Sequence, residues 1–126
     1  MNRQTVNCPF CLQNNMFEGA IIAESDKGFM TEALRNPGCY LVVPKAHAET
    51  IAELPDDWWK EMKALVPSAL GPQNSYNISF NYGADAGQTV SHLHFWIIPR
   101  EAGKTSSGKG LARLISEADG MPLALE

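Results

Sequence analysis

The sequence predicts an α+β domain, with about five strands in an antiparallel sheet, one main helix packed across it and a short C-terminal helix. Three observations predict this class: short apolar segments bounded by Gly, Pro and Asn, one longer segment with apolar residues at helical spacing, and two alternating segments joined by a glycine-rich turn. A length of 126 residues is close to the commonest domain size, so residues 1–126 are expected to form a single domain.

Three strands are predicted in the first half of the chain. Residues 19–24 and 29–34 flank a turn that ends at Gly28, which favours a hairpin. The third strand, 39–43, follows an Asn-Pro-Gly breaker and is closed by Pro44, which has no N–H to donate to a sheet.

The main helix is predicted from Leu54 to about Leu70. Five apolar residues recur there at helical spacing and define one face: Trp58, Met62, Leu65, Val66 and Ala69. Pro55 suits the first helical turn, whereas Pro67 is expected to kink or end the helix.

The fourth strand and the segment after it are predicted to pair antiparallel through a turn at residues 83–87. Residues 76–82 alternate between large apolar and small polar side chains. In the following segment His92, His94 and Trp96 are expected to share one face, opposite Leu93, Phe95 and Ile97. Residues 101–110 are rich in Gly, Ser and Lys and are expected to form a flexible loop before a helix at 111–118.

The composition fits a soluble globular protein. The chain is 44% hydrophobic and 19% charged, with a net charge of −4, so it is not expected to be disordered or to coat nucleic acid. No apolar run approaches the ~20 residues that span a bilayer, and the first residues lack the apolar core of a signal peptide. We therefore expect no membrane or nucleic-acid partner and a cytoplasmic location.

The cysteines predict metal binding or redox chemistry in place of a disulfide framework. There are three, an odd number, and Cys8 and Cys11 form a C-x-x-C pair. A glutaredoxin-like redox motif follows a strand and opens a helix, but only seven residues precede this pair. The remaining interpretation is that the two cysteines are small buried hydrophobic residues with no chemical role.

Several short motifs occur along the chain between residues 41 and 100. Asn81, Gly83, Gly87-Gln88-Thr89-Val90, His92, His94 and Ile98-Pro99-Arg100 follow an earlier Leu41-Val42-Val43-Pro44-Lys45-x-His47. This set resembles the histidine triad (HIT) family of nucleotide hydrolases and transferases, and the resemblance extends from the cysteine pair to Arg100. It implies the HIT fold, a nucleotide substrate and a homodimer.

The resemblance also implies a mechanism. The middle histidine, here His94, would attack the α-phosphorus and form a nucleotidyl-histidine, which water or another acceptor resolves. A neutral imidazole on a rigid segment suits this role. The backbone carbonyl of His92 would orient the ring, and the donors around the phosphate would come from Asn81, Gln88 and Thr89, next to Gly87. A hairpin turn that is merely lined with polar residues is the simpler alternative.

Trp96 departs from the family pattern because it stands where the third histidine is expected, beside the leaving group. An indole donates one N–H but does not titrate, so any acid would be water or a nearby base such as Lys104. Cleavage of phosphoramidates is therefore expected to be feeble and pyrophosphate-type bonds to be preferred. The alternative is a nucleotide-binding regulatory protein with little or no turnover.

Many bacterial members of the family are described with a Cys, Cys, His, His metal site. By resemblance the ligands here are Cys8, Cys11, His47 and His92, which would hold a structural zinc ion. Cys39 is either a further ligand or a filler of its strand. The family also sets an acid against the ribose hydroxyls, but residues 33–36 contain none, so the substrate stays open.

Overall fold

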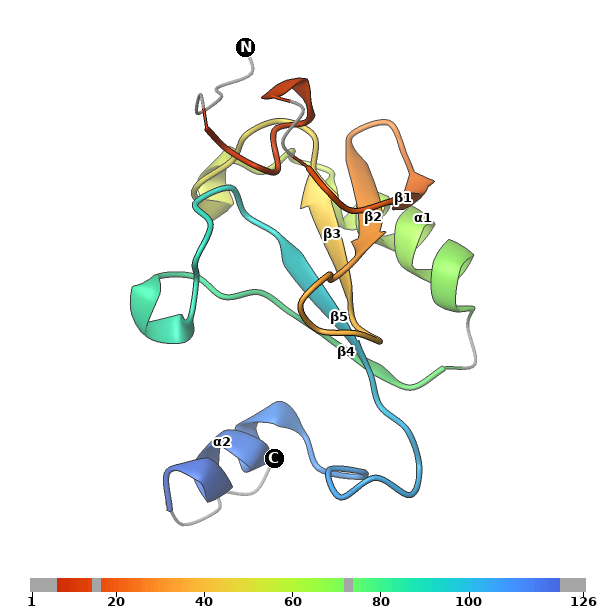
Figure 1. The fold of residues 1–126 in the computed structure, drawn as a ribbon, viewed down its shortest axis with the longest axis vertical. Coiled ribbons are helices and arrows are strands. Elements are labelled where there is room, and N and C mark those ends of the chain that lie inside the picture. The colour runs from red at the N-terminus through yellow and green to blue at the C-terminus, as the bar shows by residue number, and fades with distance from the viewer. Residues whose placement is uncertain (1–6, 15–16, 72–73, 121–126) are drawn as a thin grey trace.

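The computed structural model describes residues 7–14, 17–71 and 74–120, which contain a five-stranded antiparallel sheet (Figure 1). The strand order is β1-β2-β3-β5-β4, so the strand that follows the histidines lies between β3 and β4. The predicted fold class is confirmed. The strands are β1 (Ile21–Glu24), β2 (Gly28–Glu32), β3 (Tyr40–Pro44), β4 (Tyr76–Ser79) and β5 (Phe95–Pro99).

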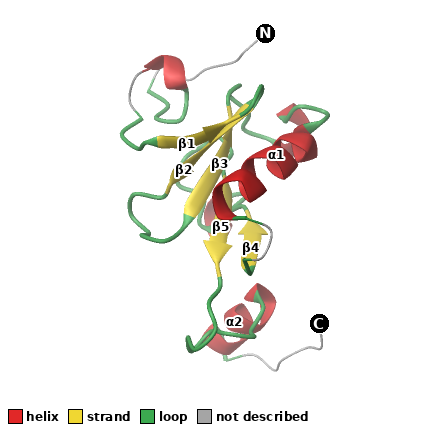
Figure 2. Ribbon diagram, turned by 90° about the vertical axis from the view of Figure 1, so that its right-hand side faces the viewer, coloured by secondary structure: helices red, strands yellow, loops and turns green. Residues whose placement is uncertain are grey.

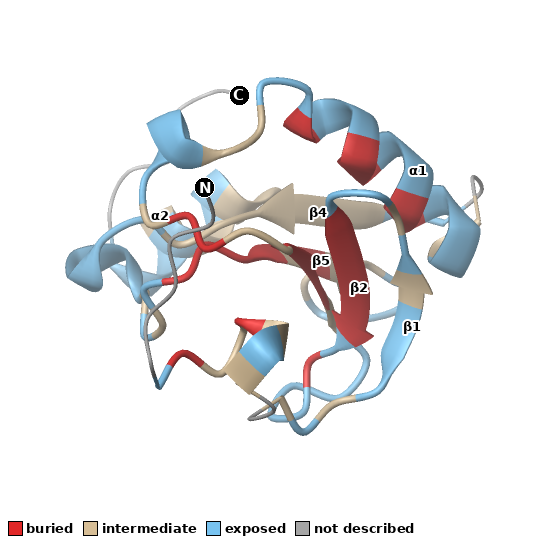
Figure 3. Ribbon diagram, turned by 90° about the horizontal axis from the view of Figure 1, so that it is seen from above, coloured by how far each residue is buried: buried red, intermediate tan, exposed pale blue. Residues whose placement is uncertain are grey.

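Helix α1 (Trp58–Leu70) lies across one face of this sheet (Figure 2). Four of the five residues predicted to face inward are buried, and they pack on Met30, Val42, Phe95 and Ile97 of the sheet. Ala69, the fifth, is exposed, and the next residue, Leu70, packs against the core instead. Buried residues gather in β2, β5 and the inner face of α1 (Figure 3).

The helix does not end at Pro67: α1 continues to Leu70, as predicted, but it begins at Trp58 and not at Leu54. A proline lacks the N–H that would bond the carbonyl four residues earlier, here that of Lys63. Both residues lie on the exposed side of the helix, where water can satisfy this carbonyl. The Pro67 carbonyl in turn accepts from the N–H of Gly71, at which the helix ends.

Glu61 is a charged residue on the buried face of α1, where its spacing of three residues from Trp58 places it, although the sequence analysis did not single it out. One carboxylate oxygen accepts from the Ser25 hydroxyl at 2.5 Å and from the Lys27 N–H at 2.8 Å. These bonds lower the pKa of Glu61, because they favour the charged form over the opposing effect of burial. Glu61 thus joins the turn between β1 and β2 to the helix.

Replacing Glu61 with alanine is expected to lower the free energy of unfolding by about 1–3 kcal/mol, because the partly buried Ser25 hydroxyl and the Lys27 N–H lose a charged acceptor. The stabilisation should be complete above pH 4.5, the ordinary pKa, and should be lost as the pH falls through the lower pKa of the folded state. Urea denaturation at pH 7 and below pH 4 measures both effects. Asp56→Asn, at an exposed carboxylate, is the control; an equal loss in both variants at pH 7 would contradict this assignment.

The other face of the sheet is covered by the N-terminal segment. Phe29, Ala33, Leu41 and Val43 form a second apolar cluster there. Phe10, Leu12, Phe17, Cys39 and Trp96 pack against that cluster. The sheet therefore lies between α1 and the N-terminal segment, whose described residues include the 3₁₀ turn Leu12–Asn14.

The histidines do not lie within a strand, contrary to the prediction, because β5 begins only at Phe95. Its pairing with β3 ends at Val42, although β3 itself continues to Pro44. Pro44 has no N–H to extend this ladder, and its carbonyl accepts from the His92 ring at 2.7 Å. The N–H of Leu93 bonds the Ala48 carbonyl at 2.8 Å, so the chain turns away from the sheet here.

The hairpin prediction for β4 and β5 is confirmed, with Ile78 opposite Ile97, but β4 ends at Ser79 and not at residue 82. The 3₁₀ turn Ala84–Ala86 follows and is closed by Gly87, whose φ of +91° favours glycine. Another 3₁₀ turn, Ile51–Glu53, precedes α1.

Residues 101–110 form a series of turns held by Arg100. Its guanidinium donates to the side-chain oxygen of Asn77 and to the carbonyls of Ser106 and Lys109, each at 2.5 Å. Helix α2 (Leu111–Ala118) follows as predicted, but it lies apart from the sheet and none of its residues is buried (Figure 1). Within the described ranges, no helix has the length and apolar character that crossing a bilayer requires.

The outer strand β1 is irregular. Its register with β2 shifts between Ile21 and Ala23, which is the mark of a β-bulge. Ile21 and Ile22 are exposed at 40% and 41% of their surface, so this edge of the sheet presents apolar side chains to solvent.

Candidate nucleotide site and metal centre

Four side chains predicted as metal ligands meet at one end of the sheet. Cys8 and Cys11 come from the turn before residues 12–14, His47 from the segment after β3, and His92 from the segment before β5. Their ligand atoms all lie within 4.8 Å of one another, and all four residues are buried. Cys39 lies outside this group and packs against the second apolar cluster instead.

In His47 and His92 the hydrogen bonds use Nε2, so Nδ1 of each ring is left to bind a metal. His92 Nε2 donates to the Pro44 carbonyl at 2.7 Å, and His47 Nε2 lies 2.8 Å from a Glu49 carboxylate oxygen. In each ring the lone pair is therefore on Nδ1, which faces the cysteines. Burial lowers the pKa of His92 to about 4, so its ring is neutral at pH 7.

The distances between donor atoms fit a small tetrahedral ion. Cys11 Sγ lies 3.1 Å from His47 Nδ1 and 3.5 Å from His92 Nδ1, and Cys8 Sγ lies 3.4 Å from His92 Nδ1. Sulfur and nitrogen ligands at usual zinc bond lengths and tetrahedral angles lie about 3.6 Å apart. Two thiols and two imidazoles are also the donor set that zinc favours. The four side chains could therefore hold a metal ion.

His94 faces away from this cluster. Its Nδ1 donates to the backbone carbonyl of His92 at 3.0 Å, which leaves the Nε2 lone pair for the other side of the ring. Burial lowers the pKa of His94, and the hydrogen bond to the His92 carbonyl partly opposes this shift. The imidazole is thus neutral near pH 7 and can act as a nucleophile at Nε2.

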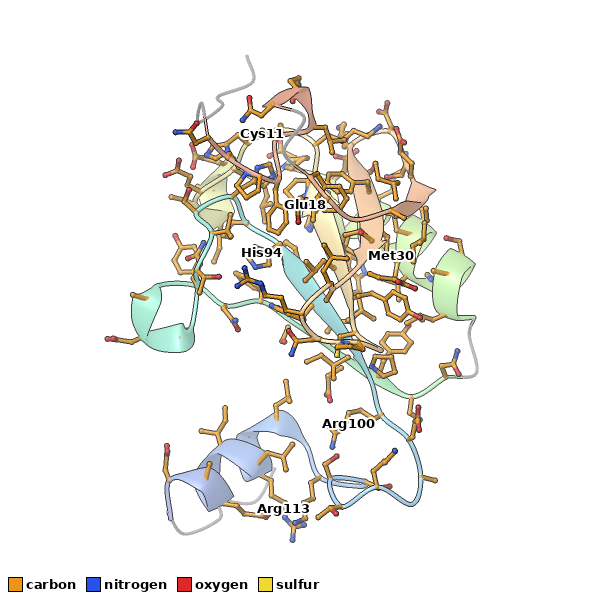
Figure 4. All side chains as sticks on the ribbon, in the orientation of Figure 1. Cys11, Glu18, Met30, His94, Arg100 and Arg113 are labelled. Atoms are coloured by element: carbon orange, nitrogen blue, oxygen red, sulfur yellow. The ribbon has the colours of Figure 1, made fainter. Side chains whose placement is uncertain are left out.

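A cleft of about 590 Å³ opens in front of His94. Thr89, Val90 and Trp96 line it together with the segment 33–36 between β2 and β3. Its other wall comes from the N-terminal segment and includes Glu18, which lies between the labels of Cys11 and His94 in Figure 4; Cys11 itself does not line the cleft. The volume is within the range of small-molecule sites, about 300–1,000 Å³.

The predicted phosphate donors do not all reach this cleft. Thr89 and Trp96 line it, whereas Asn81, Gly87 and Gln88 are not among its lining residues. The Gln88 side chain braces its own loop, because its oxygen accepts from the Gly83 N–H and its amide donates to the Val90 carbonyl, both at 2.9 Å. In this conformation the Gln88 amide fixes the loop that carries Thr89.

Several lining residues were missed by the sequence analysis. They are Pro9, Phe10, Phe17, Glu18, Glu32 and Arg35. Phe10 could have been found, because a residue between two cysteines that meet His92 must lie close to His94. Glu32 gave no such signal, because alternation along β2 places it on the face of Met30. Glu32 therefore supplies a carboxylate to the cleft, directly before residues 33–36, where the sequence analysis looked for an acid and found none.

Lys104, considered as an acid near the leaving group, does not line the cleft. It borders a separate depression of about 320 Å³ next to Arg100, Leu111 and Leu114. Lys109 is ion-paired with Glu117 of α2 at 2.9 Å. Neither lysine is placed to act on a group bound at His94.

Comparison with known proteins agrees with this fold. The sequence matches the HIT domain over residues 22–103. An uncharacterized HIT-like protein of Methanocaldococcus jannaschii is 40% identical over 105 residues, which cover 76% of this chain and 81% of that protein. The chain belongs to the HIT family.

Two further relatives bear on the chemistry. An adenosine 5'-monophosphoramidase of Schizosaccharomyces pombe is 39% identical over 85 residues, covering 65% of this chain and 63% of that enzyme. A zinc-bound histidine triad family protein of Mycobacterium smegmatis has a similar structure, with a TM-score of 0.64, 25% identity and coverage of 90% and 89%. At the level of the family, nucleotide hydrolysis is thus represented among the relatives of this chain.

Proposed function

We propose that this protein transfers the nucleotidyl group of a nucleoside polyphosphate-type substrate to water through a covalent intermediate on His94. One observation carries the proposal: the His94 ring is fixed through Nδ1 by the His92 carbonyl, and it lines a cleft large enough for a nucleotide. The S. pombe relative, an adenosine 5'-monophosphoramidase by name, supports hydrolysis of a nucleotide but not the choice of a polyphosphate, which rests on Trp96.

In the first step His94 Nε2 attacks the α-phosphorus, and the bond from phosphorus to the leaving oxygen breaks. The ring then carries a positive charge, which the hydrogen bond from Nδ1 to the His92 carbonyl stabilises. In the second step a water oxygen bonds to phosphorus, the bond to Nε2 breaks with its electron pair returning to the ring, and the water's proton is released to solvent. The products are a nucleoside monophosphate, the released leaving group and a neutral His94.

The donors around the phosphate are proposed to be Thr89 with Asn81, Gly87 and Gln88, and His92 contributes through its carbonyl. Thr89 already lines the cleft. Asn81 lies beside Gly87, since its amide nitrogen is 3.6 Å from where a side chain at Gly87 would begin. Gln88 would have to leave its loop contacts to donate directly. Phosphoryl transfer depends on such preorganised donors.

The cluster of Cys8, Cys11, His47 and His92 is proposed to bind zinc. With four protein ligands the ion has no open position, so its contribution is structural. It would join the N-terminal segment to the segment that holds His94. We also propose a homodimer, as the family resemblance implies, and a cytoplasmic location. Transfer of the nucleotidyl group to a phosphate acceptor in place of water is a further proposal.

The test is to mix the protein with a radiolabelled dinucleoside polyphosphate, quench it in alkali and look for an acid-labile phosphohistidine. An adduct at His94 supports the proposal. A protein that binds the nucleotide without adduct or turnover would be a regulatory binder instead.

Trp96, which by resemblance replaces the third histidine, is expected to restrict the leaving group. A polyphosphate leaves without protonation, whereas an amine needs a proton that an indole does not supply. Replacing Trp96 with histidine should raise the rate on adenosine 5'-phosphoramidate by about 10²-fold or more and change the rate on a dinucleoside polyphosphate much less. Steady-state kinetics on both substrates decides this, and equal phosphoramidate rates in the two proteins would refute the restriction.

A further inference from the structure

Residues 8–11 belong to both sites at once. Cys8 and Cys11 lie in the proposed metal cluster, and the two residues between them, Pro9 and Phe10, line the cleft. Two ligands that flank a dipeptide fix both of its ends. The position of Phe10 therefore depends on what holds the two cysteines together, in addition to its packing on Phe17 and the second apolar cluster.

Phe10 also contacts the proposed nucleophile. Its ring centroid lies 4.9 Å from that of His94 in an edge-on arrangement and 6.1 Å from that of His92. Such aromatic pairs have geometric preferences that restrict both rings. Phe10 thus forms a wall of the cleft and packs on the imidazole that faces it.

Hydrogen bonds join residues 8–11 to their own N-terminal segment. The N–H of Cys11 bonds the Cys8 carbonyl at 3.4 Å, and the Asn14 side chain donates to the same carbonyl at 3.0 Å. Both bonds are local, joining residues within the N-terminal segment. The cluster, in contrast, connects the segment to His47 and His92, which are anchored to Glu49 and to the Pro44 carbonyl.

We infer that Phe10 is a positioning residue through which a metal ion in the cluster raises the affinity of the cleft for nucleotide. The inference rests on the proposed function, because it takes the cleft to be the nucleotide site. Coupling of this kind is reciprocal, so bound nucleotide must also slow or weaken the loss of metal. The metal then does more than stabilise the fold: it shapes the wall against which the nucleotide lies.

The experiment measures AMP binding by calorimetry to the zinc-loaded protein and to protein stripped with a chelator. We expect zinc-loaded protein to bind AMP about 10-fold more tightly, a usual size for coupling between two sites. In the reciprocal measurement, saturating AMP should slow the transfer of zinc to a coloured chelator by a similar factor. This second readout does not depend on turnover.

Phe10→Ala separates the coupling from general stability, because it leaves all four ligands in place. The variant should bind one zinc per chain, bind AMP about 10-fold more weakly, and lose the protection of zinc by AMP. Leu12→Ala is the matched control: Leu12 packs on the same apolar cluster but does not line the cleft. It should retain both the AMP affinity and the protection.

Equal AMP affinity with and without zinc, or undiminished protection in Phe10→Ala, would overturn the inference while leaving the proposed function intact. If zinc-loaded wild-type protein bound no AMP and formed no adduct, the proposed function would fail and this inference with it. Should the stripped protein be unfolded by circular dichroism, the comparison of zinc-loaded Phe10→Ala with Leu12→Ala decides the matter.

Discussion

Replacing His94 with alanine is expected to abolish the phosphohistidine adduct and to lower kcat by on the order of 10⁴-fold or more, because the covalent route is lost entirely. AMP affinity should change little, since Thr89, Trp96 and the N-terminal wall of the cleft are retained. Burst kinetics with a labelled dinucleoside polyphosphate measures adduct and turnover together.

Ser91→Ala is a suitable control for His94→Ala, because Ser91 is an exposed neighbour in the same segment. It should form the adduct at the wild-type rate. If His94→Ala retained turnover, the nucleophile would have to be sought elsewhere, and the hydrogen bond between His94 and the His92 carbonyl would have only a structural meaning.

Cys11→Ser is expected to have the largest effect on stability. The binding free energy of a structural zinc ion is about 10 kcal/mol or more at pH 7, and it contributes to folding because the unfolded chain lacks the site. We expect the variant to lose zinc and its Tm to fall by more than about 10 °C, since each kcal/mol shifts the Tm of a domain of this size by about 3–6 °C.

Cys39→Ser is the matched control for this loss. It also replaces a thiol by a hydroxyl, but Cys39 lies outside the cluster and is only partly buried. Its Tm should change little and its zinc content should stay at one ion per chain. Equal zinc content and Tm in Cys11→Ser and wild type would show that the cluster is not a metal site.

The elements of the fold could largely be predicted from local patterns. Alternation along residues 76–79 and 95–99 and the apolar face of α1 both correspond to structure. The predictions failed where contacts between residues far apart in the sequence determine the structure. Pro67 is tolerated because its side of the helix faces solvent, and Glu61 is buried because Ser25 and Lys27 supply donors from a distant turn. Neither partner can be inferred from helical spacing.

The site shows the same division. The resemblance predicted that Cys8, Cys11, His47 and His92 would lie together, and their side chains do. His94 lines the cleft next to them. The resemblance could not predict that the pairing of β3 with β5 would stop at Val42, or that Gln88 would fold back on its loop. Those outcomes depend on which backbone groups compete for the same donors, which is a property of the assembled structure.

The bulge in β1 has a consequence for how this sheet meets other chains. An open edge strand offers unpaired N–H and carbonyl groups at a regular repeat, and a second extended chain can add to it without limit. Ile21 and Ile22 would make such growth favourable, but the shifted register breaks the repeat beside them. The irregular register thus disfavours fibril-like stacking along an edge whose apolar side chains would otherwise promote it.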